Sequence, residues 1–280
     1  MKTMTLLSLI AGAVLLHSAA HAQQQAEPVT QVIVDESVFG FSEQPRLLNA
    51  YLAAELEPSA YWPSSRVVTA EQTQKLAERR TQVLERLQQL TRVAQAEGEK
   101  ELAAEAQAYA EQLQSWPLIG AEWIGLTKID DRIDVQSGVS FERRSLYSSF
   151  NQATASLQAN PLLPQGTLQI LPPRELGAWQ VTVVSPAGVQ KLPFGATDTV
   201  RGVLQQAGVF KQRYDLESAY LIALTGLSRS TDVAYYNDAK VMPPVHGLIF
   251  VGLDLSAMGA EWQSLNTQLR ALLSYWNPQS

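Results

Sequence analysis

The sequence predicts an α+β protein in which one unit of strands and helix occurs twice. The second occurrence is the clearer: a strand pattern over 179–184 leads through the turn Ser185-Pro186-Ala187-Gly188 into a short strand over 189–194. A helix that ends at Gly208 comes next, and an apolar strand over 248–252 follows much later. A repeated unit of this kind determines the architecture before any single motif is interpreted.

The first occurrence has the same order of signals. Strand patterns over 29–34 and 38–41 precede a helix over 46–52, and a returning strand covers 167–172. A hairpin, a helix and a late strand describe a helix held across a small mixed sheet, which is the β-grasp arrangement. We therefore expect two β-grasp domains in tandem, over residues 23–176 and 177–253.

The first unit is the longer because residues at about 69–114 are inserted in it. The insertion opens with Thr69-Ala70-Glu71-Gln72, a capping-box pattern that starts helices, and Gly98 separates two helical patterns. Their apolar residues recur on one helical face at Leu76, Val83, Leu87, Leu90, Ala94, Leu102, Ala106, Tyr109 and Leu113. These signals predict a helical hairpin, which either packs on itself with solvated outer faces or forms an arm that docks a partner.

Residues 254–280 predict a C-terminal amphipathic helix that Asp254 or Ser256 caps. Its apolar stripe recurs at steps of three and four, at Leu255, Met258, Trp262, Leu265, Leu269, Leu272 and Trp276. The stripe either covers the protein's own core or contacts a membrane surface or other protomers. The first interpretation is favoured, because helices on membrane surfaces usually have a basic polar face and this one has only Arg270.

Residues 1–22 have the pattern of a secretory signal peptide. Lys2 is its positive charge, residues 6–16 are its short apolar run, and Ala20-His21-Ala22 is its cleavage box, so the mature chain is expected to start at Gln23. The sequence has no Cys, which excludes a lipid-anchored Cys and disulfides. No other apolar run approaches the roughly 20 residues of a membrane helix. We expect a periplasmic protein with no stable membrane insertion.

Composition excludes several classes of function. The net charge of -6 argues against nucleic acid, and any anionic ligand would need a local cluster of Arg. Only His246 remains after removal of the signal peptide, so the common zinc sites cannot be built and a Ser-His-Asp site would depend on this one residue. Phosphate-loop and dinucleotide motifs are absent from the sequence. We expect no metal, no cofactor and no enzymatic activity.

The densest polar cluster lies directly after the insertion. Arg132 and Asp134 share a face if the segment is a strand, and Arg143 follows closely. An Arg fork flanked by carboxylates could hold sugar hydroxyls or the carboxylate of a uronic acid. The alternative is a structural ion pair. Acidic residues this close in sequence do not resemble the two opposed carboxylates of a glycoside hydrolase.

Aromatic residues are a second candidate ligand surface, because sugar rings stack on flat aromatic faces. Trp62, Trp116 and Trp123 flank the insertion at both its roots and could converge near Arg132. The alternative is that these large rings anchor the helical hairpin to the sheet. Tyr235-Tyr236 is expected on a strand, where at most one of the two rings is exposed.

Several stretches, in this order, resemble the capsule-biosynthesis GfcC family. They are Ser115-Trp116-Pro117-Leu118-Ile119-Gly120, Asp131-Arg132-Ile133-Asp134-Val135, Asn160-Pro161-Leu162-Leu163, Tyr235-Tyr236-Asn237, Phe250-Val251-Gly252-Leu253 and Leu265-Asn266-Thr267-Gln268-Leu269. The resemblance implies SLBB-type (soluble ligand-binding β-grasp) domains, similar to those of Wza-like polysaccharide exporters. It also implies a periplasmic role in making or exporting a surface polysaccharide, and a soluble monomer.

These expectations combine into one function. The chain is expected to be a non-catalytic accessory protein of capsule or exopolysaccharide production that binds polysaccharide or components of the export machine. One alternative is an adaptor to an outer-membrane exporter without sugar binding. A polysaccharide-modifying hydrolase is the less favoured alternative.

Overall fold

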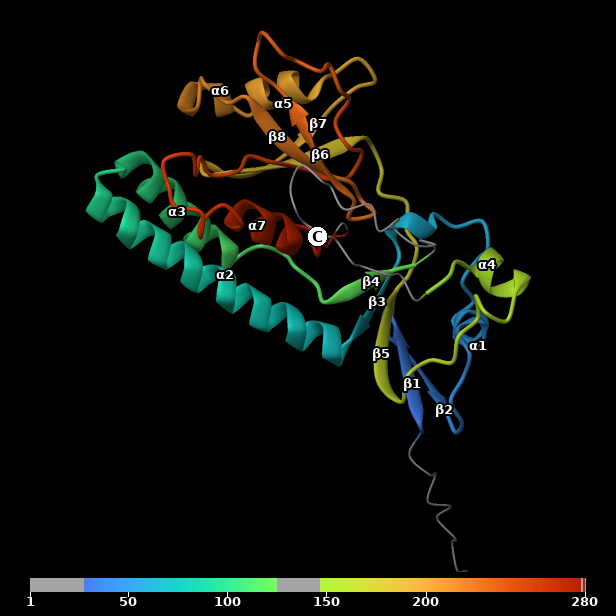
Figure 1. Ribbon diagram of the computed structural model, residues 1–280. Coiled ribbons are helices and arrows are strands. Elements are labelled where there is room, and N and C mark those ends of the chain that lie inside the picture. The colour runs from blue at the N-terminus through green and yellow to red at the C-terminus, as the bar shows by residue number, and fades with distance from the viewer. Residues whose placement is uncertain (1–27, 125–146, 278, 280) are drawn as a thin grey trace, which may run out of the picture.

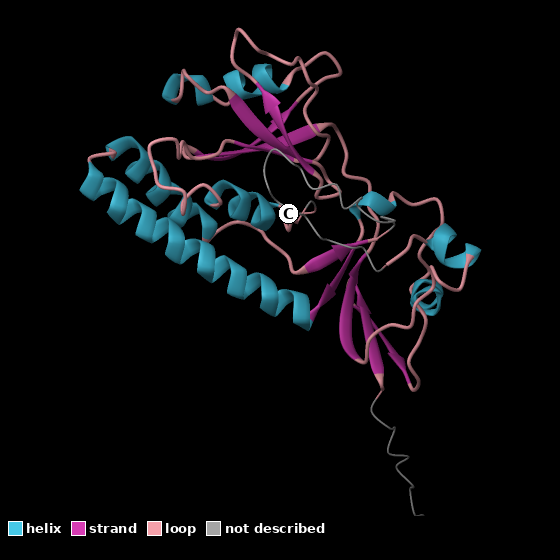
Figure 2. Ribbon diagram, viewed as in Figure 1, coloured by secondary structure: helices cyan, strands magenta, loops and turns pink. Residues whose placement is uncertain are grey.

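Two five-stranded sheets with the same strand order dominate the structure (Figure 1, Figure 2). The computed structural model describes residues 28–124, 147–277 and 279. The strand order is β2-β1-β5-β3-β4 in the first sheet and β7-β6-β10-β8-β9 in the second. The pairs β1–β5 and β6–β10 are parallel, and the other pairs are antiparallel. The predicted α+β class and the repetition of one unit are therefore confirmed.

The predicted strands and helices occur in the expected order, together with four strands and three short helices that the sequence patterns did not indicate. The first sheet comprises β1 (Thr30–Val34), β2 (Ser37–Phe41), β3 (Arg66–Thr69), β4 (Ala121–Trp123) and β5 (Gly166–Leu171). The second comprises β6 (Gln180–Ser185), β7 (Gly188–Pro193), β8 (Ser218–Ile222), β9 (Ser228–Asp232) and β10 (Leu248–Phe250). The helices are α1 (Leu47–Ala53), the 3-10 helix η1 (Trp62–Ser64), α2 (Ala70–Glu97), α3 (Lys100–Leu113), α4 (Phe150–Ala155), α5 (Val200–Gln206), α6 (Val209–Gln212) and α7 (Leu265–Leu273). In the part of the chain that the structure describes, no helix has the length and apolar character needed to cross a membrane.

The first sheet has a core on one face. Val32 and Val34 of β1 and Leu168 and Ile170 of β5 are buried there, together with residues of α1. The residues between them along each strand are half-buried, because successive side chains point to opposite faces. Hydrophobic burial therefore stabilises this sheet mainly from the side of α1.

The second sheet is buried on both faces. Val181 and Val183 of β6 belong to a cluster with α5, whereas Val184 belongs to a cluster with α2, α3 and α7. Strand β10 is divided in the same way, since Ile249 contacts the α5 side and Phe250 the opposite side. This sheet is thus the middle layer between α5 on one side and the three helices on the other (Figure 1).

The two inserted helices α2 and α3 form part of that second cover, together with α7. The Thr69 hydroxyl accepts a hydrogen bond from the backbone N–H of Gln72 at 3.3 Å, as expected of the residue that caps α2. Gly98, with a φ of 89°, ends α2 in the left-handed conformation that glycine adopts readily. Tyr109 of α3 packs on Phe250 of the second sheet with ring centres 5.6 Å apart, whereas α2 packs on α3 and α7 within the same cluster of buried residues. Although the helices are inserted in the first unit, their apolar face is part of the core of the second.

The predicted C-terminal helix over 254–280 is wrong in its extent. The helix α7 begins only at Leu265, and residues 254–264 form turns. Polar side chains satisfy the backbone locally in place of a helix: Gln263 Nε2 donates to the Leu255 carbonyl at 2.7 Å, and Asp254 accepts from the Ser256 N–H at 3.0 Å. The apolar stripe is nevertheless buried in the core with α2 and α3, which confirms that it covers the protein's own core.

A buried Arg joins the two units. Arg66 of β3 donates to the Leu224 carbonyl, in the turn between β8 and β9, at 2.6 Å. The Nε1 of Trp123 donates to the same carbonyl at 3.1 Å, and the Arg66 guanidinium lies 5.5 Å from the centre of the Trp123 ring. The Trp123 ring also packs so closely on Gly226 that a Cβ there would lie 1.9 Å from ring atoms. This contact fixes the edge of the first sheet against a turn of the second.

Candidate functional site

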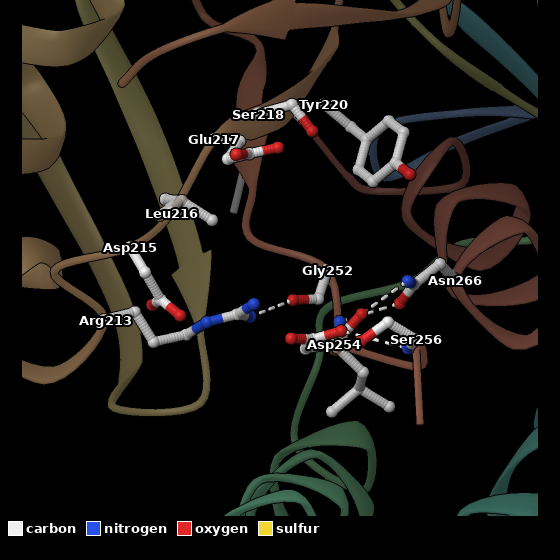
Figure 3. A pocket seen from close by; sticks show the side chains of 11 residues that line it. Arg213, Asp215, Leu216, Glu217, Ser218, Tyr220, Gly252, Asp254, Ser256 and Asn266 are labelled. Carbon is white, nitrogen blue, oxygen red and sulfur yellow. Dashed lines mark hydrogen bonds between the residues drawn. The ribbon is translucent and has the colours of Figure 1, made fainter. Parts of the chain in front are cut away.

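A polar pocket of about 410 Å³ lies beside the second sheet (Figure 3). Its walls come from the loop between α6 and β8, from β8 itself, from the chain that follows β10, and from α7. The polar residues that line it are Arg213, Asp215, Glu217, Ser218, Tyr220, Asp254, Ser256 and Asn266. The pocket thus holds three carboxylates and one guanidinium.

Asn266 and Asp254 hold the chain that follows β10. The Asn266 amide makes two hydrogen bonds with the backbone of Leu253, donating to its carbonyl and accepting from its N–H, both at 2.8 Å. Hydrogen bonds from Ser256 hold the pKa of the Asp254 carboxyl below its ordinary value. Asp254 therefore presents a carboxylate on a wall whose backbone is fixed from α7 (Figure 3).

Arg213 joins the pocket to the helices that cover the sheet. Its guanidinium donates to the Gly252 carbonyl and lies 3.7 Å from a carboxylate oxygen of Glu105 on α3. Burial raises the pKa of the Glu105 carboxyl, although the nearby Arg213 opposes that shift. The guanidinium is half-buried and used in these contacts, so we assign it mainly to shaping the pocket.

Exposed tyrosines adjoin the pocket. The hydroxyl of Tyr236 donates to a carboxylate oxygen of Glu217 at 2.5 Å, and this bond raises the pKa of the Tyr236 hydroxyl. Tyr235 and Tyr236 are both exposed, so the expectation that at most one of them is exposed is wrong. Strand β9 ends at Asp232, and the two rings lie beyond it, where the alternation of a strand no longer applies.

The chemistry of the pocket suits a neutral, hydroxyl-rich ligand. Carboxylates accept hydrogen bonds from hydroxyl groups, and the Ser, Tyr and Asn side chains can both donate and accept. The three carboxylates against one guanidinium give the pocket a negative balance, which disfavours an anionic group. Within the described ranges, no three His, Cys, Asp or Glu side chains are grouped as a metal ion would require.

The predicted candidate residues that the structure describes lie outside this pocket. Arg132, Asp134 and Arg143 are outside the described residues. Trp62, Trp116 and Trp123 are all buried, and they lie in three different contacts. Trp62 packs 4.9 Å from the Tyr51 ring in the first core, Trp116 lies in the cluster of α2 and α3, and Trp123 lies at the junction with Gly226. The structure does not bring these three rings together on an exposed surface.

The residues of the pocket were missed by the interpretation of the sequence. Its clearest signal is the run Arg213-Tyr214-Asp215-Leu216-Glu217, in which charged residues alternate ahead of a strand. The opposite wall comes from residues 252–266, close to the C-terminus. Only the folded chain brings these two segments together, because β8 and β10 pair in the sheet.

The fold and the pocket define a class: a two-unit α+β protein with a polar pocket on its second unit. Two family models match the chain, described as "Capsule biosynthesis GfcC, N-terminal" over residues 24–139 and "Capsule biosynthesis GfcC C-terminal" over residues 188–277. The chain belongs to the capsule biosynthesis GfcC family, which confirms the resemblance. Family membership indicates a role in capsule biosynthesis or export. A search of curated proteins found no match.

Proposed function

We propose that this protein is a periplasmic, non-catalytic accessory of capsule production that binds the polysaccharide chain in the pocket of Figure 3. The observation that carries the proposal is the set of carboxylates and neutral polar groups around a cavity of about 410 Å³. A polysaccharide offers many hydroxyl groups, and family membership supplies the capsule context. The signal-peptide pattern of residues 1–22 supports the periplasmic location.

We also propose that both units are β-grasp domains of the SLBB type, within the boundaries expected from the sequence. Each has a hairpin, a following helix, and a later strand parallel to the first strand of the hairpin. This arrangement supports the assignment, and the resemblance to Wza-like exporters agrees with it. The protein would act as a soluble monomer beside such an exporter.

The non-catalytic role is supported by the place of the remaining His. His246 lies in a turn with a φ of 54°, and burial lowers the pKa of its imidazole. It does not line the pocket. Acid–base work in the pocket would therefore depend on its carboxylates, and Glu217 already accepts the hydrogen bond of Tyr236.

An adaptor without sugar binding is the second candidate. The outer face of the first sheet favours it, because along β1 and β5 this face is only half-buried and Val38 of the neighbouring β2 is exposed. Exposed apolar side chains on a sheet can contact a partner protein.

Saturation-transfer NMR on residues 23–280 with oligosaccharides cut from the host's own capsule tests the proposal. We expect saturation of the sugar in the wild type. Asp215→Asn removes one carboxylate from an exposed part of the rim and is expected to weaken affinity roughly tenfold, the loss of a charge-assisted hydrogen bond. Glu36→Gln, an exposed acid in the β1–β2 turn, is the matched control and should bind normally.

No saturation with the wild type at millimolar sugar would overturn the proposal and favour the adaptor. An equal loss of affinity for the sugar in Asp215→Asn and in Glu36→Gln would show that the net charge of the protein, not the pocket, determines binding.

A further inference from the structure

Three tyrosines stand out from the described surface. Tyr214, Tyr235 and Tyr236 are 88%, 88% and 74% exposed, more than any other large hydrophobic side chain that the structure describes. The next is Leu157 of the first unit, at 68%. Folded domains usually scatter such residues singly, so a group of three aromatic rings calls for an explanation.

The three rings belong to one end of the second sheet. Tyr214 precedes β8, and the other two follow β9. These strand ends are paired: Ser218 is opposite Asp232, and the Val233 N–H donates to the Glu217 carbonyl at 2.8 Å. The two loops that carry the tyrosines are therefore neighbours, although about twenty residues separate them in the sequence.

Both loops adjoin residues that line the pocket. Tyr214 lies between Arg213 and Asp215, which line it, and Tyr236 donates its hydroxyl hydrogen to Glu217, which also lines it. None of the three tyrosines lines the pocket itself, but each lies on a loop that adjoins it.

The Tyr235 loop is held from the helix beneath it. The guanidinium of Arg201 on α5 lies 4.6 Å from the centre of the Phe210 ring and 5.9 Å from that of Tyr235. The same guanidinium donates to the Val233 carbonyl, and the Asn237 N–H donates to the Ala234 carbonyl at 3.2 Å in the turn. An ordered loop presents its rings with little loss of conformational freedom on binding.

We propose that Tyr214, Tyr235 and Tyr236 extend the pocket into a binding track for several consecutive sugar units of a polysaccharide. The inference rests on the proposed function of the pocket. The C–H face of a sugar ring packs on a flat aromatic ring, while its hydroxyl groups bond to polar groups at the ring edge. Here those polar groups are Asp215, Glu217 and the tyrosine hydroxyls, whereas the centre of a protein interface is normally depleted of charge.

A track of this kind makes affinity depend on the length of the ligand. Each added sugar unit that reaches a ring is expected to gain roughly two- to tenfold in affinity, the range of one aromatic contact. A disaccharide would occupy the pocket alone and gain nothing from the rings.

The test is calorimetric titration of the full mature chain with size-fractionated fragments of the host's capsular polysaccharide. The probes are a disaccharide, a tetrasaccharide and an octasaccharide, prepared by partial acid hydrolysis. We expect the octasaccharide to bind the wild type at least about tenfold more tightly than the disaccharide. The double variant Tyr214→Ala/Tyr235→Ala should lose this gain and keep its affinity for the disaccharide.

Two controls separate the track from general effects. Tyr214→Trp/Tyr235→Trp keeps flat rings and should keep the gain with length. Tyr61→Ala removes an exposed tyrosine of the first unit and should bind every fragment as the wild type does.

The failures of the two proposals differ. If the disaccharide binds but the octasaccharide binds no more tightly, the track is overturned and the pocket stands. If no fragment binds, the proposed function fails and the track with it. If photo-crosslinkers at position 235 capture a protein and the Ala variant binds all fragments normally, the surface is a protein interface and the inference is wrong.

Discussion

The first and second sheets share one strand order but differ in what covers them. The first has a core with α1 on one face, and its other face is half-buried along β1 and β5 but buried against the second unit at Arg66 and Trp123. The second lies between α5 on one side and α2, α3 and α7 on the other. Repetition of a unit in the sequence therefore does not repeat its packing, because a neighbouring segment decides which faces lose contact with water.

Because of this difference, the stability of the second unit depends on helices that are inserted in the first unit. The helices on the side of the second sheet opposite α5 include α2, which starts directly after Thr69 at the end of β3 in the first sheet (Figure 1). Residues of α2 share one buried cluster with residues of the second sheet. Tyr109 of α3, fully buried, donates its hydroxyl hydrogen to the Val251 carbonyl just after β10. We therefore expect the described core to unfold in one cooperative transition rather than unit by unit.

The largest expected effect comes from Phe250, whose ring packs on Tyr109 of α3 on the face of the second sheet opposite α5. Phe250→Ala should lower the free energy of unfolding by about 3–5 kcal/mol, because the ring is fully buried and leaves a cavity. Ile33→Ala removes a half-buried side chain from the outer face of the first sheet and should cost about 1 kcal/mol or less. Urea denaturation of both variants measures the contrast.

Similar decreases in the free energy of unfolding for Phe250→Ala and Ile33→Ala would contradict the comparison of the two sheets. Two separate transitions in the wild type would contradict the dependence of the second unit on the first.

Much of this architecture could be predicted from local patterns, and the shared core could not. Gly98 and the cap at Thr69 delimited the inserted helices because helix ends obey local rules. The apolar face of α2 indicated burial but not its partner, since Leu87 and Leu90 would look the same against any apolar surface. The stripe after Asp254 had helical spacing, yet its chain forms turns, because periodicity records which side chains are buried and not the backbone between them.

The candidate site was harder to predict than the fold. The pocket combines residues of the Arg213 loop with Asp254 and Asn266, segments about forty residues apart, and no motif of fixed spacing marks it. Large aromatics at the roots of the insertion were the more visible candidates, but Trp116 and Trp123 are buried. A sequence shows which side chains can bind sugar, whereas exposure depends on how the two units pack.

The junction of the two sheets should show the next largest effect. Gly226→Ala places a Cβ 1.9 Å from the Trp123 ring at a position whose φ is 79°, so both overpacking and backbone strain are expected, about 2–5 kcal/mol together. Gly208→Ala is the matched control, because Gly208 has a φ of 76° and no atom lies within 4 Å of the added Cβ. This variant should lower the free energy of unfolding by only about 1–2 kcal/mol. Thermal unfolding of the two variants separates the contact from the strain, and equal losses would show that the contact with Trp123 is unimportant.

The smallest expected effect concerns Glu105, the charged contact between α3 and the second unit. Its pKa is raised by burial in the folded chain and returns to about 4.3 on unfolding. The folded state then binds its proton more tightly, so this carboxyl makes the free energy of unfolding fall as pH rises from about 4.3 through the raised value.

Glu105→Gln cannot lose a proton and removes that fall, so its stability relative to the wild type should increase with pH across the window. Urea denaturation between about pH 4 and 7 measures the slope, and exposed Glu111→Gln on the same helix, which is not among the charges acting on Glu105, is the control. A difference between Glu105→Gln and the wild type that stays constant with pH would mean that Glu105 is not held in a desolvated contact, and that α3 covers the second sheet more loosely at its polar edge than at Tyr109.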